Sequence, residues 1–379
     1  MKIEQRQWTR ERGWRVTSIR DSMEPPQLVM FFAASEVMRD GHVIQALRDT
    51  YPTAHVLGCS TAGEICGTEV SDHTVVAMAI RFDHSSVQTR YGRISDAAHS
   101  AAEGRRLAEQ LPREGLVHVM VLAEGLNVNG SELAAGLRQG LPSSVAVTGG
   151  LAADGADFSK TCVSLDGQSG DGGVALVGFY GDRLRVGYGS LGGWDPFGPE
   201  RVVTRSRGNV LYELDGSSAL DLYKDYLGEH ASDLPASGLL FPLSLRGEGN
   251  EPGLVRTILA INEESRSLVF AGDIPEGRFA RLMKANVDRL IDGAHGAAGA
   301  SHAALGAVAP DLAILISCVG RKLVLKQRVE EEAESVREVL GPGTAMAGFY
   351  SYGEIAPFAN SVRCELHNQT MTITTLSER

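Results

Sequence analysis

The chain has 379 residues, of which 43% are hydrophobic and 22% are charged. These proportions are ordinary for a globular protein and exclude a fibrous or disordered chain. Its 36 lysines and arginines against 47 aspartates and glutamates give a net charge of −11. A net anion of this kind opposes non-specific binding to nucleic acid and to anionic membranes.

The cysteines and the hydrophobic runs indicate the compartment. The five cysteines form no C-x-x-C pair and no spacing typical of zinc sites, which predicts reduced thiols. The first 20 residues contain no hydrophobic signal segment. The longest hydrophobic runs are about seven residues, against about 20 for a membrane-spanning helix. We therefore expect a cytoplasmic protein without membrane insertion.

A repeat dominates the chain after its first 26 residues. Residues 1–26 have no clear hydrophobic period, so we expect a lead segment with one strand around residues 14–19. Three similar strand–helix–strand units follow, over residues 28–65, 117–158 and 312–355. In each unit the second strand ends in a glycine turn. The repeat predicts an α/β fold with mixed sheets and repeated strand–helix–strand units in two pseudo-symmetric domains.

The segments between the units supply further elements. The hydrophobic pattern predicts a strand and a helix over residues 208–226 and a long helix over residues 275–305. Further strands are expected over 74–82, 174–180, 184–189 and 366–376. The best linker candidate is residues 228–235. We therefore place one domain at residues 27–227 and a second at residues 228–379.

The exit turns of the first and third units carry prominent polar residues. At the junction of a strand and a glycine turn, the first unit (GCSTAGEI) presents Cys59, Ser60, Thr61 and Glu64. The third unit (GFYSYGEI) presents Tyr352 and Glu354 in the corresponding turn. Strand ends gather ligand groups in α/β folds, so these turns predict a polar ligand pocket. The alternative is a pair of equivalent structural turns whose hydroxyls bond their own backbone.

Two further observations concern charge and catalysis. Arg321 follows the first strand of the third unit, where it could bind a carboxylate or phosphate, or pair with Glu354 or a neighbouring acid. The turn around Cys59 and Ser60 does not match the G-x-S-x-G pattern, and no histidine is placed by sequence as a base. We therefore expect no enzyme, and a thiol-dependent enzyme that uses Cys59 is the alternative.

The histidines and one helix start offer other sites. His367 precedes the last strand and is the candidate haem ligand, because a haem needs only one proximal histidine; a structural role is the alternative. His295 and His302 are seven residues apart and are expected to lie on a helix edge rather than at a metal. Residues 127–131 precede a helix, which predicts capping or an anion site.

In combination these motifs resemble the FIST family of cytosolic sensory proteins, over nearly the whole chain. The FIST N domain is matched by GCSTAGEI, TGGLAAD, GGW and LYELDGSSALDLY, and the FIST C domain by SCVGR, GFYSYGEIAP and LHNQT. The resemblance implies a ligand-binding input module of signal transduction. Members are thought to bind small ligands such as amino acids, and one branch binds haem and senses nitric oxide. They act in trans on a histidine kinase or a cyclic-dinucleotide enzyme.

Together, the motifs and the resemblance predict a cytoplasmic sensory protein with a small ligand between or within its domains. The expected ligand is haem with nitric oxide sensing, with His367 as its candidate ligand; an amino acid or another small metabolite is the alternative. The expected partner is a histidine kinase or a cyclic-dinucleotide enzyme, and homo-oligomerisation stays open. The expected ligand-binding residues are Cys59, Ser60, Thr61, Glu64, Arg321, Tyr352 and Glu354.

Overall fold

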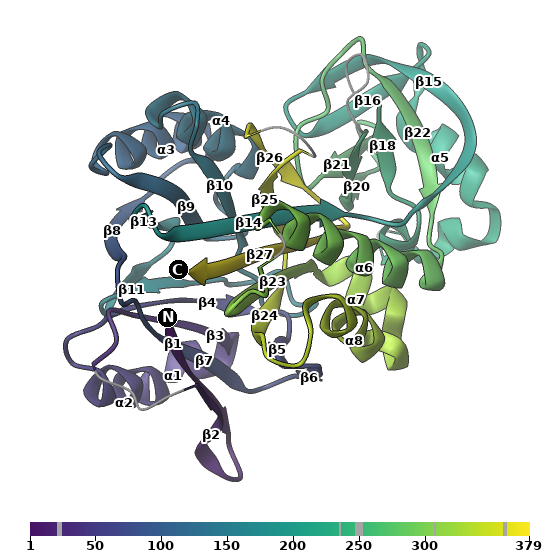
Figure 1. Ribbon diagram of the computed structural model, residues 1–379. Coiled ribbons are helices and arrows are strands. Elements are labelled where there is room, and N and C mark those ends of the chain that lie inside the picture. The colour runs from purple at the N-terminus through teal and green to yellow at the C-terminus, as the bar shows by residue number, and fades with distance from the viewer. Residues whose placement is uncertain (21–24, 235, 247–252, 307, 359–361) are drawn as a thin grey trace.

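The computed structural model describes residues 1–20, 25–234, 236–246, 253–306, 308–358 and 362–379. Three mixed sheets with helices on their outer sides form the main body, and a fourth β structure stands beside it (Figure 1). None of the described helices is long and apolar enough to span a membrane.

The first repeat builds a sheet with the order β4-β3-β7-β1-β2. β3 and β4 are parallel, and β7 runs antiparallel to β3. Residues 2–20, expected in a lead segment with one strand, form two strands of this same sheet. The elements are β1 (Lys2–Thr9), β2 (Gly13–Arg20), β3 (Leu28–Ala34), α1 (Ser35–Asp40), α2 (His42–Thr50), β4 (His55–Thr61) and β7 (Val75–Arg81).

The second and third repeats build sheets of the same order, β10-β9-β13-β8 and β24-β23-β27-β14. The second contains β8 (Ser86–Arg93), α3 (Ser100–Glu109), β9 (Leu116–Ala123), α4 (Gly130–Gly140), β10 (Ala146–Leu151) and β13 (Gly173–Tyr180). The third contains β14 (Leu184–Leu191), α6 (Val287–Ala304), β23 (Leu312–Cys318), α7 (Val319–Leu325), α8 (Val329–Leu340), β24 (Ala345–Ser351) and β27 (Met371–Glu378).

Each repeat also contains a short hairpin that pairs with a strand of another repeat. The hairpin of the first repeat pairs with β24, that of the second with β4, and that of the third with β10. The three exchanges close a ring, so every sheet contains strands from two repeats. The hairpins are β5 (Glu64–Cys66) with β6 (Glu69–Ser71), β11 (Val163–Leu165) with β12 (Gln168–Gly170), and β25 (Gly353–Pro357) with β26 (Cys364–His367).

A glycine in the second strand of every repeat sits at a close approach of two backbones. A Cβ atom there would lie 2.3, 1.8 and 1.8 Å, respectively, from the carbonyl oxygen of the residue opposite in the parallel neighbour. Only glycine fits such a contact, which explains why the closing strands share this residue. The pairs are Gly58 with Phe31, Gly149 with Val121, and Gly348 with Leu315.

The first strands of the repeats are buried on both faces, as expected for near-continuous hydrophobic runs. One face contributes to a core shared by the three sheets, where the rings of Phe32 and Phe349 stack at 4.8 Å. The other face packs under the helices of its own repeat. Alternate residues of these strands enter the shared core: Leu28, Met30, Phe32, Met120, Leu122, Leu312, Ile314 and Ile316.

A β domain with its own core is inserted in the third repeat, between β14 and α6. The expected boundary at residues 227/228 lies within it, and the expected linker contains a short 3₁₀ helix, Gly228–Asp233, while Pro235 is outside the described residues. Its elements are β15 (Asp195–Arg207), β16 (Val210–Leu214), β17 (Ser217–Ser218), α5 (Ala219–Leu227), β18 (Leu243–Leu245), β19 (Leu254–Arg256), β20 (Ile258–Asn262), β21 (Ser267–Phe270) and β22 (Phe279–Lys284).

Two expected elements differ from the structure. The long helix over residues 275–305 is wrong in its first part, because β22 precedes α6 and Asn286 caps the helix by accepting a hydrogen bond from the Arg289 amide. The single strand over 366–376 is wrong as well, because β26 and β27 are separated by a turn in which Gln369 has a φ of 63°.

Candidate functional site

Glu64 is clamped at the start of the first exchanged hairpin. Its carboxylate accepts hydrogen bonds from the hydroxyl of Thr61 and from the amide and hydroxyl of Thr74, the latter two at 3.0 and 2.6 Å. The side chain is buried, and burial raises its pKa to about 7. Glu64 and Thr61 therefore fasten the hairpin to the start of β7.

Glu354 repeats this arrangement in the third repeat. It accepts hydrogen bonds from the hydroxyl of Ser351 at 2.5 Å and from the amide and hydroxyl of Thr370 at 3.2 and 2.9 Å. Burial raises its pKa to about 8. The two glutamates are thus equivalent clamps on different sheets, and no described pocket is lined by both.

Cys59 and Ser60 lie inside the core rather than at a cleft. The Ser60 hydroxyl accepts a hydrogen bond from the Cys162 amide at 2.9 Å, which joins β4 to the hairpin of the second repeat. Cys59 is fully buried, and burial raises the pKa of its thiol well above the ordinary value. A reactive cysteine needs a lowered pKa and access to solvent, and Cys59 has neither property.

Arg321 is fully buried and pairs with Glu332, not with Glu354. Its Nε and Nη2 donate to the Glu332 carboxylate at 3.1 and 2.8 Å. The remaining bonds run to the carbonyl oxygens of Gly192 and Leu290, at 2.5 and 2.6 Å. Arg321 therefore joins α7, α8, α6 and the end of β14, and it lines none of the described pockets.

The surroundings of His367 do not fit a haem. The ring is buried against Phe358, and its Nε2 lies 3.0 Å from the carbonyl oxygen of Ala356. Burial lowers its pKa to about 4. A haem iron needs an accessible imidazole nitrogen beside a large cavity, and His367 lines none of the described pockets.

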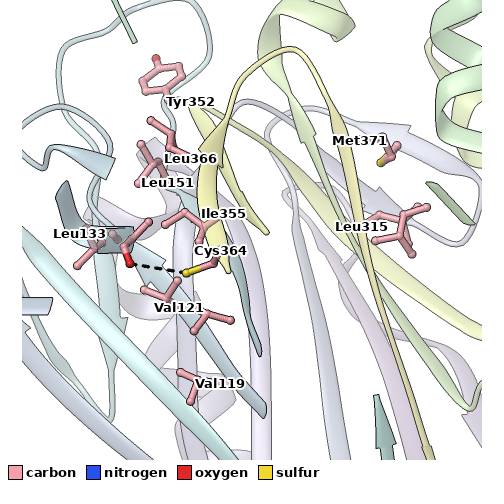
Figure 2. Close-up of a cluster of buried hydrophobic side chains, with 14 of the residues drawn as sticks. Val119, Val121, Leu133, Leu151, Leu315, Tyr352, Ile355, Cys364, Leu366 and Met371 are labelled. Atoms are coloured by element: carbon pink, nitrogen blue, oxygen red, sulfur yellow. Dashed lines mark hydrogen bonds between the residues drawn. The ribbon is translucent and has the colours of Figure 1, made fainter. Parts of the chain in front are cut away.

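Tyr352 is the one expected ligand-binding residue that lines a cavity in the described part of the chain. This cavity, of about 170 Å³, lies at the ends of β9 and β10, between the second repeat and the inserted β domain. Figure 2 shows Leu133, Leu151, Ile355 and Cys364 in the hydrophobic cluster to which Tyr352 belongs, with Tyr352 at one end. Because strand ends gather ligand groups in α/β folds, this cavity is the candidate site.

A strained loop presents an aromatic ring at the cavity. Phe158 stacks on Tyr352 with ring centroids 4.5 Å apart, is 39% exposed and has a φ of 47°. A positive φ is rare for a bulky residue and costs about 1–3 kcal/mol, and such strain clusters at functional sites. The loop before β11 therefore holds Phe158 in an unfavourable conformation beside a cavity.

Asp154 anchors this loop. It accepts hydrogen bonds from the amides of Ser159 and Lys160, at 2.9 and 2.6 Å, and from the hydroxyl of Tyr352. Burial opposes the ionisation of Asp154, but these bonds outweigh burial and lower its pKa. The charged form of Asp154 thus fixes both rings of the stack.

The remaining walls are apolar or neutral. Two exposed leucines, Leu126 and Leu259, line the cavity, one from the second repeat and one from the inserted domain. Asn129 and Asn209 supply its only polar side chains besides the Tyr352 hydroxyl, among the described residues. Asn129 also caps α4, as expected for residues 127–131. No described lining residue carries a charge.

The sequence did not single out most of these residues. Phe158, Leu126 and Leu259 lie in loops or on an edge strand with no recognisable pattern, and an exposed hydrophobic residue is ordinary when isolated. Their convergence depends on how the inserted domain meets the second repeat. The available signal was the turn after TGGLAAD, where Asp154 and a glycine predict a constrained loop.

Comparisons with known proteins place these features in a family. The FIST N domain matches residues 27–217 and the FIST C domain matches residues 219–357. An uncharacterized protein, MJ1623, of Methanocaldococcus jannaschii is 25% identical over 299 residues, which cover 69% of this chain and 55% of that protein. The chain thus spans about half the length of this relative.

The chain also matches a solved structure weakly. The cyanuric acid hydrolase from A. caulinodans aligns over 78% of this chain and 99% of its own, with 10% identity and a TM-score of 0.19. So low a score carries no argument about fold or activity.

Proposed function

The chain belongs to the FIST family, whose domains are sensory and ligand-binding, and we propose that its ligand binds in the cavity beside Phe158 and Tyr352. The observation that supports this is the strained, half-exposed Phe158, stacked on Tyr352 at the mouth of a cavity. We further propose that the protein binds this ligand without turning it over.

The lining favours a small, uncharged ligand with a flat or apolar face. Sites for drug-sized ligands have volumes of about 300–1,000 Å³, so a cavity of about 170 Å³ admits a smaller molecule. Aromatic rings bind flat groups by stacking, and the amides of Asn129 and Asn209 can orient one or two polar atoms. A haem is too large for this volume, and a free amino acid would bring two charges without charged partners.

The position of the cavity suggests how binding becomes a signal. Its walls come from the second repeat and from the inserted β domain. A ligand that contacts both shifts the equilibrium between two arrangements of these parts if its affinity for them differs. We propose that a partner histidine kinase or cyclic-dinucleotide enzyme responds to this shift.

The test is ligand-induced thermal stabilisation of the full chain, with a panel of small uncharged aromatic compounds, amino acids and haem. We expect an uncharged compound to raise the melting temperature saturably, and Phe158→Ala to weaken its binding at least tenfold. Phe279→Ala is the matched control, because Phe279 is 40% exposed and lies away from the cavity. Equal binding by Phe158→Ala and the wild type would place the ligand elsewhere.

A further inference from the structure

A second, strongly charged pocket lies at the same junction of the second repeat and the inserted domain. Its volume is about 240 Å³, and α4, β26 and the ends of β18 and β19 contribute to its walls. In contrast to the neutral cavity beside Phe158, it is lined by four arginines and three acids: Arg138, Arg246, Arg256, Arg278, Glu132, Asp273 and Glu365.

Arg256 is the central cation of this pocket. Arg256 is 3% exposed, and burial lowers the pKa of its guanidinium to about 10, although the nearby Asp273 and Glu365 partly raise it. Nε and Nη1 donate to the carbonyl oxygens of Asp273 and Leu366, at 3.1 and 2.8 Å. Among the described residues, no carboxylate forms an ion pair with Arg256 and no acceptor bonds its Nη2. Buried charges in proteins are normally paired.

Several of the neighbouring charged residues bond other partners. Arg138 pairs with Glu365 and also donates to the Cys364 carbonyl at 2.8 Å. Arg246 pairs with Glu200. The Asp273 carboxylate accepts a hydrogen bond from Asn129 at 3.2 Å. Asp273 and Glu365 offset part of the Arg256 charge from a distance, but neither forms an ion pair with it in the described structure.

Ser131 gives a second, independent observation. Ser131 is one of the residues that line the same pocket, and its hydroxyl is buried without a hydrogen-bond partner in the described structure. A buried hydroxyl left unbonded costs about 1–3 kcal/mol. Ser131 also lies in the first turn of the eleven-residue α4, where the helix dipole favours negative charge.

We propose that this pocket binds the oxyanion of a small ligand, a carboxylate or a phosphate group, through Arg256 and Ser131. The guanidinium supplies a charged fork and the hydroxyl supplies a further donor. Arg256 belongs to β19 of the inserted domain and already bonds β26, which is paired into the sheet of the second repeat. A bound anion would therefore strengthen the attachment of the inserted domain to that sheet. The proposal does not depend on the cavity beside Phe158.

The test measures binding of inorganic phosphate and of acetate to the full chain by calorimetry and thermal shift, at constant ionic strength in chloride. We expect one of the two anions to bind saturably, which also identifies the oxyanion class. Ser131→Ala should weaken binding about tenfold, the usual effect of losing a hydrogen bond to a charged group. It should not lower the melting temperature of the anion-free protein, because the hydroxyl has no partner to lose.

Two further variants complete the experiment. Arg256→Met should abolish measurable binding, whereas Arg205→Met removes an arginine that pairs with Glu213 outside the pocket and should bind like the wild type. If Arg256→Met does not fold, the anion affinity of Ser131→Ala tests the proposal instead. The proposal is overturned if neither anion binds saturably, or if Ser131→Ala binds the anion as tightly as the wild type.

Discussion

Glu64 and Glu354 stay buried although each is a carboxylate, because hydroxyl and amide donors of neighbouring segments surround them. Burial disfavours the charged form, and raises the pKa to about 7 for Glu64 and about 8 for Glu354. The donors partly offset this effect, since each bond to the carboxylate favours ionisation. Near neutral pH both groups therefore change charge inside the folded protein.

This titration predicts that the protein is less stable at pH 8 than at pH 6.5. The folded state keeps a proton on Glu354 that the unfolded state loses above its ordinary pKa of 4.5, so the stabilisation falls as pH rises towards 8. Between pH 6.5 and pH 8, we expect the free energy of unfolding of Glu354→Gln to fall by about 1–2 kcal/mol less than that of the wild type. Urea unfolding at the two pH values measures the difference.

Two histidines do not disturb this comparison. Burial lowers the pKa of His118 to about 3 and of His367 to about 4. These two histidines therefore change the stability mainly at pH values below their ordinary pKa of 6.5. Other groups titrate equally in the variant and the wild type. Parallel stability curves for the two proteins would contradict the assignment of the titration to Glu354.

At single positions, the sequence predicted the kind of interaction that a side chain makes better than the place of that side chain in the fold. It predicted that Arg321 binds a ligand, with an ion pair to Glu354 or a neighbouring acid as the alternative, and the structure pairs Arg321 with Glu332, 11 residues ahead on α8. Tyr352 was expected at a ligand site and does line a cavity, whereas Ser60 and Cys59 are enclosed. A strand end can lie in the interior of the body or at its surface, and the neighbouring repeat determines which of the two occurs.

At the scale of elements, the paired glycines set how closely the parallel strands approach. Gly348 of β24 lies against the Leu315 carbonyl of β23, and a Cβ atom would come within 1.8 Å of that oxygen. The contact is backbone against backbone, so no side chain can move aside. The same contact recurs in all three repeats, which ties it to the architecture rather than to one site.

We therefore predict that Gly348→Ala destabilises the protein by about 3 kcal/mol or prevents folding, because overpacking in a rigid core costs at least 1–3 kcal/mol. Gly299→Ala is the matched control, since Gly299 lies in α6 with no atom within 4 Å of the added Cβ. It should gain about 0.5–1 kcal/mol from helix propensity. Thermal unfolding of both variants checks the contrast, which similar melting temperatures would refute.

The sequence predicted the helices and strands best where a single hydrophobic period continued without interruption. The three repeats follow from their hydrophobic strands and glycine turns, and the structure contains all three. The junction of β22 and α6 was missed because Leu282 and Met283 of the strand continue the three-and-four spacing of the helix. The cap residue Asn286 marks the true start. The hairpin exchanges could not be predicted, since pairing between repeats leaves no local pattern.

The whole molecule is held together by these exchanges. The hairpin strand β5 of the first repeat pairs with β24, and β10 of the second repeat pairs with β25. Both the first and the second repeat therefore depend on strands of the third repeat. Ile65 of β5 is fully buried by this pairing. Unpaired strand edges and exposed hydrophobic residues promote aggregation, and the ring leaves neither at these positions. The body is therefore expected to unfold as one unit.

A fragment of residues 1–183, with two complete repeats, should consequently fail to fold cooperatively, because it lacks both β24 and β25. The matched control is a circular permutant that starts at residue 184 and ends at residue 183. It retains every exchange, and the two ends of this chain are close enough to link, since the Met1 ammonium lies 3.6 Å from the Glu378 carboxylate (Figure 1). The new ends fall in the exposed turn between β13 and β14. Circular dichroism should show one sharp unfolding transition for the permutant and none for the fragment, and a sharp transition of the fragment alone would show that two repeats fold without the ring.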